Sequence, residues 1–241
     1  MSLSRTDRSS SLETDRLIEL RIGTGEGSKS YFVQQTVLER TSEYFCKALQ
    51  PNAFKEGREG RLEFPEDNVA GWTLLLGWMF FNNVPKVPSN GEPVYCSAWV
   101  LGDKYGVPKF QDEVILRLMV HFEGGNISAR NLSASLDAAI HGSKLQRLLL
   151  EEAVVSLKEG ECDKEQVAKM LEGRNVWGGF LDAYEKYARD YNFAFCRVVC
   201  RTCYPQDGQV SSSLKDYMIG EVADEHWIYH HIDCSAHPKH K

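Results

Sequence analysis

The chain has 241 residues, of which 42% are hydrophobic and 26% charged, a balance typical of a globular protein with one large or two small cores. Its formal net charge of −6 argues against a protein whose main ligand is nucleic acid, since such proteins cluster Lys and Arg against the phosphates. The longest apolar run, Trp72 to Phe81, is about half of the roughly 20 residues that a membrane span needs, and the N-terminus carries no apolar signal-peptide core. We therefore expect a soluble chain of the cytoplasm, the nucleus or both, with neither nucleic acid nor a membrane as its partner.

The N-terminal part of the sequence predicts a polar arm followed by a hairpin. Residues 1–14 are rich in Ser and Arg, which is typical of a disordered segment. Two strands are predicted over 17–22 and 31–33, separated by a glycine-rich stretch at 23–27. This stretch lacks the third glycine of a dinucleotide-binding loop and the Lys of a P-loop, so we interpret it as a turn.

The rest of the chain is predicted to be helical apart from one short strand at 62–64. One continuous helix is predicted over 36–50, where Tyr44 and Ala48 lie four residues apart on one face. Acids and Asn in the segment 65–68 predict the start of a wide apolar helix that is buried on most sides. Further helices are predicted over 94–105, 108–122, 128–141, 144–158, 163–172 and 176–197.

Five segments of the first half follow one another in a recognisable order. They are Phe32–Leu38, Ser42–Phe45, Phe54–Glu56, Leu62–Asp67 and Val100–Val107. In this order and spacing they resemble a BTB/POZ domain, and in particular the small fungal BTB domain-containing proteins, over residues 15–122. The resemblance implies an α+β fold, in which a small sheet is capped by helices.

Two departures from the BTB/POZ pattern bear on its partners. Gln34 and Gln35 stand where the family has a His-Lys pair, and we predict no Asp at the start of the first strand to partner that Lys. In the family this charged pair lines a groove, so we do not expect a partner that reads charge there. The arm 1–14 carries only Leu3 and Leu12 as large apolar residues, which weakens the case for a dimer formed by exchanging N-terminal segments.

The domain organisation follows from these elements. We predict a disordered arm at 1–14, a BTB/POZ domain at 15–122, an all-α extension at 127–197 and a Cys/His-rich tail at 198–241. Gly124-Gly125 marks the boundary between domain and extension.

The tail is the one place where a metal site is predicted, because four of the seven cysteines and five of the seven histidines lie beyond residue 195. Cys200 and Cys203 have the spacing that lets two thiolates occupy adjacent corners of a zinc tetrahedron, and His230 with Cys234 would complete a structural Cys3His site. Other ligand sets stay open, because His226 and Cys196 lie at the helical spacing of four from His230 and Cys200. His231 and His237 are further candidates beside them. The alternative is a set of buried thiols followed by a solvated His-rich tail.

We predict no catalytic residue and no organic cofactor, because the sequence contains none of the nucleophile-elbow, zincin, Walker or kinase motifs. The BTB/POZ resemblance implies protein–protein interaction, including a homodimer and, in many members, docking on a cullin scaffold as a substrate adaptor of a ubiquitin ligase. Two alternatives remain open. One is a homo-oligomeric scaffold or transcriptional co-regulator without a cullin, and the other is a metal-dependent enzyme that uses the tail cluster.

Overall fold

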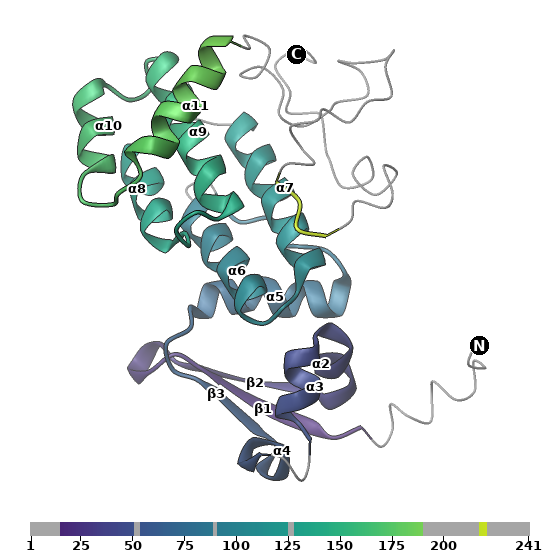
Figure 1. Cartoon of the computed structure of the whole chain (residues 1–241). Coiled ribbons are helices and arrows are strands. Elements are labelled where there is room, and N and C mark those ends of the chain that lie inside the picture. The colour runs from purple at the N-terminus through teal and green to yellow at the C-terminus, as the bar shows by residue number, and fades with distance from the viewer. Residues whose placement is uncertain (1–14, 51–53, 89–90, 125–127, 190–216, 221–241) are drawn as a thin grey trace, which may run out of the picture. The chain divides into compact units, whose positions relative to one another are not determined.

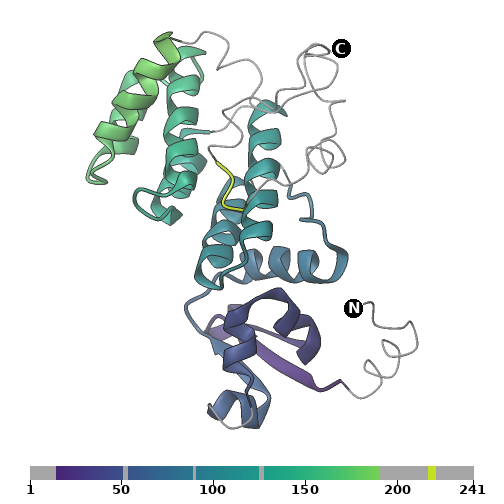
Figure 2. The same ribbon diagram turned by 45° about the vertical axis from the view of Figure 1, so that its right-hand side comes forward.

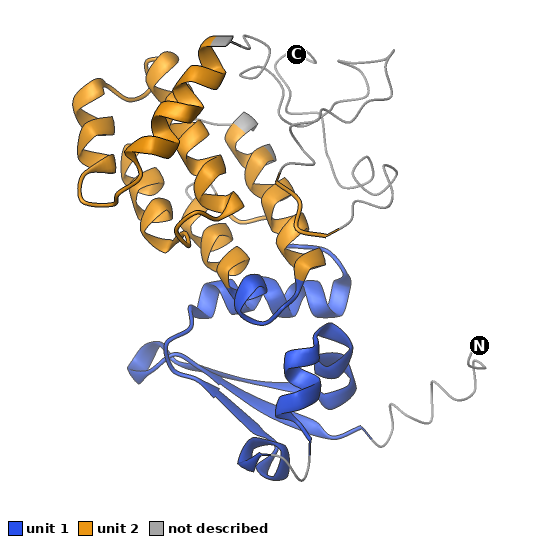
Figure 3. Ribbon diagram, in the orientation of Figure 1, with its two compact units in different colours: residues 1–85, 101–107 blue, residues 86–100, 108–241 orange. Residues whose placement is uncertain are grey.

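The computed structural model describes residues 15–50, 54–88, 91–124, 128–189 and 217–220 (Figure 1). Within them the chain is a mixed α+β protein, mostly helical, with one three-stranded sheet. Two compact units are formed, one by residues up to Pro85 together with Leu101–Val107, and one by Lys86–Val100 together with the residues from Pro108 onward (Figure 3). The predicted α+β class is confirmed at this level.

The sheet of the first unit has the strand order β2-β1-β3. Strand β1 (Leu17–Ile22) pairs antiparallel with β2 (Lys29–Gln34) and parallel with β3 (Arg61–Phe64). Alternate side chains of β1, Ile18, Leu20 and Ile22, are fully buried, because successive residues of a strand point to opposite faces. All three predicted strands are confirmed.

The glycine-rich stretch between β1 and β2 is a turn, as predicted. Gly23 and Gly25 have φ angles of 75° and 66°, in the left-handed region that glycine adopts without steric penalty. A single 3-10 turn, η1 (Gly25–Gly27), lies at its centre.

The predicted continuous helix over 36–50 is wrong, because the structure divides it into α2 (Gln35–Thr41) and α3 (Glu43–Ala48). Ser42 between them is extended, with φ −158° and ψ 157°. Thr41 already turns its hydroxyl onto the carbonyl of Val37 at 2.8 Å. A Thr hydroxyl competes with the backbone for hydrogen bonds in this way, which favours a helix end here that helical periodicity does not reveal.

Helix α4 (Lys55–Glu59) precedes β3, and α5 (Val69–Phe81) follows it. The side chain of Asn68 accepts a hydrogen bond from the Gly71 amide at 2.9 Å, which confirms the predicted helix start. The expectation that this helix is buried on most sides holds for its first turns only, because Phe81 at its end is 79% exposed.

All the secondary-structure elements in the described part of the second unit are helices (Figure 2). Its helices are α6 (Glu92–Lys104, whose last four residues belong to the first unit), α7 (Pro108–Gly124), α8 (Ala129–Ala138), α9 (Lys144–Lys158), α10 (Lys164–Leu171) and α11 (Trp177–Arg189). They confirm the predicted helices as far as residue 189. Helices α9 and α11 lie side by side. None of the helices in the described ranges is both long and apolar enough to cross a lipid bilayer.

Candidate interaction site beside strand β3

The predicted zinc ligands lie outside the described residues. This applies to the favoured set and to the alternates alike: Cys200, Cys203, His230 and Cys234, and His226, His231 and Cys196. Within the described ranges, no group of three or more His, Cys, Asp or Glu side chains is arranged to hold a metal ion. The zinc site in the tail therefore stays a prediction.

In the first unit the best-defined polar centre is the carboxylate of Asp67. Its Oδ2 accepts hydrogen bonds from the indole Nε1 of Trp72, at 2.9 Å, and from the hydroxyl of Tyr105. Its Oδ1 lies 2.7 Å from the ammonium Nζ of Lys104. Burial, and then the adjacent carboxylate, raise the pKa of Tyr105, so its hydroxyl keeps the proton that it donates.

An aromatic cluster surrounds this polar centre. The ring of Tyr105 lies 4.9 Å from Tyr44, 5.6 Å from Phe45 and 5.3 Å from Phe64, measured between ring centroids. Trp72 completes the cluster, 4.7 Å from Phe64 and 5.4 Å from Tyr105. Edge-to-face and tilted pairs at these distances each contribute about 0.5–1.5 kcal/mol beyond the area that they bury. The cluster joins α3, β3, α5 and the segment 101–107.

Two adjacent residues before β1 hold the ends of two helices. The carboxylate of Asp15 accepts from the backbone amide of Thr36, at 3.3 Å, and from its hydroxyl, in the first turn of α2. The guanidinium of Arg16 donates to the carbonyls of Gly57 and Arg58 at the end of α4, at 2.6 and 2.7 Å. An anion at a helix start and a cation at a helix end both complement the helix dipole.

The Asp15 contact corrects one statement from the sequence. We predicted no Asp at the start of the first strand, but Asp15 lies two residues before β1 and bonds to the helix that follows β2. The prediction failed because it considered only an acid that would partner a Lys at position 35. The acid instead binds an amide and a hydroxyl of Thr36, which require no positive charge.

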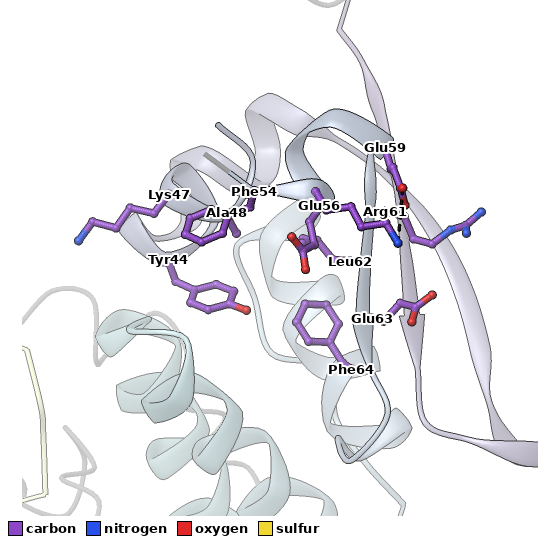
Figure 4. A pocket seen from close by; sticks show the side chains of 11 residues that line it. Tyr44, Lys47, Ala48, Phe54, Glu56, Glu59, Arg61, Leu62, Glu63 and Phe64 are labelled. Atoms are coloured by element: carbon purple, nitrogen blue, oxygen red, sulfur yellow. Dashed lines mark ion pairs between the residues drawn. The ribbon is translucent and has the colours of Figure 1, made fainter. Parts of the chain in front are cut away.

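A pocket of about 450 Å³ opens beside β3 (Figure 4). Tyr44 and Phe54 contribute the aromatic rings on one side, and Leu62 and Phe64 contribute apolar side chains from the strand. Tyr44 is 42% and Phe54 55% exposed, so both rings are available to a ligand. Burial raises the pKa of Tyr44, which therefore remains a neutral phenol that can donate a hydrogen bond.

Charged side chains around the pocket are paired with neighbours. The ammonium of Lys47 lies 2.8 Å from Glu43, that of Lys55 lies 3.6 Å from Glu59, and Arg61 Nε lies 2.8 Å from Glu19. The two lysine pairs are largely exposed, so they add little to stability and can exchange partners with an incoming ligand, whereas Glu19 in the third pair is 17% exposed. An apolar floor with exposed aromatic rings and a polar rim is the arrangement found in protein interaction sites.

Tyr44, Phe54 and Asp67 lie in three of the segments that resemble a BTB/POZ domain, but the sequence alone did not predict that they belong to one region of the fold. Asp67 was interpreted as a favourable acid before a helix, whereas it is the shared acceptor of three groups. The sequence did contain a clue to this network. The acid at the end of Leu62–Asp67 and the Lys-Tyr pair in Val100–Val107 both lie within segments that carry the resemblance.

Neither a model of a known protein family nor a curated protein matches the chain. The resemblance to BTB/POZ domains therefore depends on the five sequence segments alone.

Proposed function

We propose that the chain is a non-enzymatic protein–protein interaction module whose first unit is built on a BTB/POZ fold. The observation that carries the proposal is the meeting of three of the resembling segments. Phe45, Asp67 and Tyr105 come from the second, fourth and fifth of the five segments. They belong to one cluster, centred on the stacked pair Phe45–Tyr105 and the bond from Tyr105 to Asp67. Segments whose spacing carries a family resemblance are expected to form one core in a member of that family.

The BTB/POZ resemblance implies a substrate adaptor of a cullin-type ubiquitin ligase, and we propose this role for the chain. The pocket beside β3 supports it as a place where a partner can insert an apolar side chain between Tyr44 and Phe54. Aromatic side chains at the centre of an interface, surrounded by polar groups, commonly contribute most of the binding energy.

A homo-oligomeric scaffold without a cullin is the second candidate, and one observation favours it. Phe32 lies on β2, an edge strand of the described sheet, and is 66% exposed. An exposed aromatic on a sheet edge favours pairing with another copy of the same chain.

The test is affinity purification of the tagged full chain from native cell extract, with bound proteins identified by mass spectrometry and the mass of the purified chain measured by light scattering. Phe54→Ala removes the pocket ring, and Trp177→Ala removes an exposed aromatic of similar exposure on α11 as a matched control. A cullin recovered at near-stoichiometric yield with wild type and Trp177→Ala, but lost with Phe54→Ala, supports the adaptor and the pocket.

Other results separate the remaining possibilities. A dimer or larger assembly without a cullin would favour the scaffold, and its loss in Phe32→Ala would assign it to the β2 edge. A monomer that recovers no protein partner would contradict both proposals.

A further inference from the structure

A short piece of the C-terminal tail, Tyr217–Gly220, is seated on the helices of the second unit. It lies far along the chain from the helices that hold it, beyond residues 190–216. Every one of its four residues is either buried or hydrogen-bonded to a side chain of α7 or α9.

Tyr217 enters the site first and is almost completely buried. Its hydroxyl donates to Oε2 of Glu151, a buried carboxylate on α9. The other carboxylate oxygen, Oε1, lies 3.3 Å from Arg147 and 3.3 Å from Lys186, and the Arg147 guanidinium also lies 5.3 Å above the Tyr217 ring. The site therefore contacts both the ring of the tyrosine and its hydroxyl, and so distinguishes tyrosine from phenylalanine and from aliphatic residues.

The backbone groups of the next three residues form hydrogen bonds with side chains of α7 and α9. The carbonyl of Met218 accepts from Lys144 Nζ while its side chain is buried. The amides of Ile219 and Gly220 donate to the two oxygens of Asp112, at 2.5 and 2.9 Å. The Ile219 side chain is exposed, so the site does not select it.

The site favours glycine at position 220 because there is no room for a side chain. A Cβ at this position would lie 2.9 Å from Asp112 Oδ2, so any larger residue must displace the carboxylate that holds the segment. The four positions together define a pattern: tyrosine, a buried apolar residue, any residue, and glycine.

The Asp112 carboxylate is an acceptor that requires hydrogen-bond donors from the segment that it binds. Asp112 is buried on α7, and burial raises its pKa while the two amides of the tail oppose that change. Hydrogen bonds from backbone amides to a carboxylate are charge-assisted and stronger than those between neutral groups, so Asp112 holds the backbone of the segment firmly.

We propose that the face of α7 and α9 formed by Asp112, Lys144, Arg147 and Glu151 is a recognition site for peptides with the pattern Tyr–apolar–any–Gly. The chain's own residues 217–220 fill it in cis, and a partner protein with a segment of this chemistry competes for it. This inference uses the second unit alone, so it does not depend on the BTB/POZ proposal.

The test uses the full chain and a fluorescein-labelled synthetic peptide with the sequence of residues 215–221, followed by fluorescence anisotropy. Tyr217→Ala releases the tail and should bind the peptide at least about tenfold more tightly than wild type, in which the occupied fraction of the site lowers the apparent affinity. A peptide in which the tyrosine is replaced by alanine is the matched control. Adding Asp112→Asn to Tyr217→Ala should weaken binding by about tenfold or more.

Several outcomes overturn the proposal. They are the absence of saturable binding to Tyr217→Ala with native circular dichroism, equal binding of the alanine peptide, and equal affinity for wild type and variant. If Tyr217→Ala fails to fold, Gly220→Leu serves instead, because its side chain displaces the segment from Asp112 while Tyr217 is kept. Its failure to bind the peptide would count against the proposal in the same way.

Discussion

Asp67 and Lys104 lie 37 positions apart in the sequence and form an ion pair of 2.7 Å in which the two partners have very different environments. The Asp67 side chain is 5% exposed and that of Lys104 is 50% exposed. Asp67 also accepts from two buried aromatic donors, so removing either partner has unequal consequences.

Replacement of Asp67 by alanine should lower the free energy of unfolding by about 3 kcal/mol, because Trp72 Nε1 and the Tyr105 hydroxyl lose their acceptor inside the core. The measurement is urea denaturation followed by tryptophan fluorescence. Glu66→Ala, an exposed acid one residue earlier, is the matched control and should stay within about 0.5 kcal/mol of wild type. Equal effects of the two variants would show that the network does not stabilise the unit.

Lys104→Ala should destabilise far less than Asp67→Ala, by about 1 kcal/mol or less. Water can replace the half-exposed ammonium, while the aromatic donors continue to hold the carboxylate. The same denaturation experiment measures it. A loss as large as that of Asp67→Ala would mean that the lysine, rather than the aromatic donors, compensates the buried charge.

Two helical glycines should respond to alanine with opposite signs. At Gly57 in α4, a Cβ would lie 2.9 Å from the carbonyl carbon of Gln50, so Gly57→Ala should destabilise by about 2 kcal/mol. At Gly178 in α11 a Cβ meets nothing within 4 Å, so Gly178→Ala should stabilise by about 0.5–1 kcal/mol through reduced backbone entropy of the unfolded chain. Thermal unfolding of both variants measures the difference, and stabilisation by both would refute the close approach at Gly57.

Arg16→Ala should lower stability by about 1–2 kcal/mol and increase amide hydrogen exchange in α4, since its guanidinium donates to two carbonyls at the end of that helix. Arg58→Ala removes an exposed cation of the same helix and keeps the backbone carbonyl, so it serves as the control. Unchanged exchange in Arg16→Ala would assign the position of α4 to other contacts.

The thiol of Cys96 should be unreactive in the folded chain. Burial raises its pKa from 9.0 to about 12. The raised value means that the folded state holds the proton more tightly, so this contribution to stability is complete below pH 9 and is lost as the pH rises toward 12. At pH 8, N-ethylmaleimide should modify Cys96 at least about 100-fold more slowly in the folded chain than in guanidinium chloride, as measured by peptide mapping. Comparable rates in the two states would contradict its burial.

Most elements could be predicted because their periodicity is local. Alternation along Leu17–Ile22 predicts β1, and the spacing of four from Phe110 to Phe122 predicts α7, whose four side chains at that spacing are all buried. The break at Ser42 was missed because Thr41 acts through a hydrogen bond from its hydroxyl to the backbone, which a pattern of apolar residues does not record.

The parts of the site that sequence reasoning missed depend on contacts between distant segments. Asp15 and Arg16 bond to helices that begin about 20 and 40 residues later. Asp67 precedes α5 and contacts Lys104 at the end of α6. Tyr217–Gly220 is too short for any periodicity. The predicted zinc ligands lie outside the described residues, so that part of the sequence interpretation stays a prediction.

The pocket beside β3 has a balanced rim. Its charged residues are three bases, Lys47, Lys55 and Arg61, and three acids, Glu56, Glu59 and Glu63. Such a rim projects little field beyond the Debye length of about 10 Å at 0.1 M ionic strength, so it cannot draw in a charged partner from a distance. Association should then proceed at the unsteered rate of about 10⁵–10⁶ M⁻¹s⁻¹ and change little with ionic strength. Differences in affinity among partners of this pocket should therefore arise from their dissociation rates.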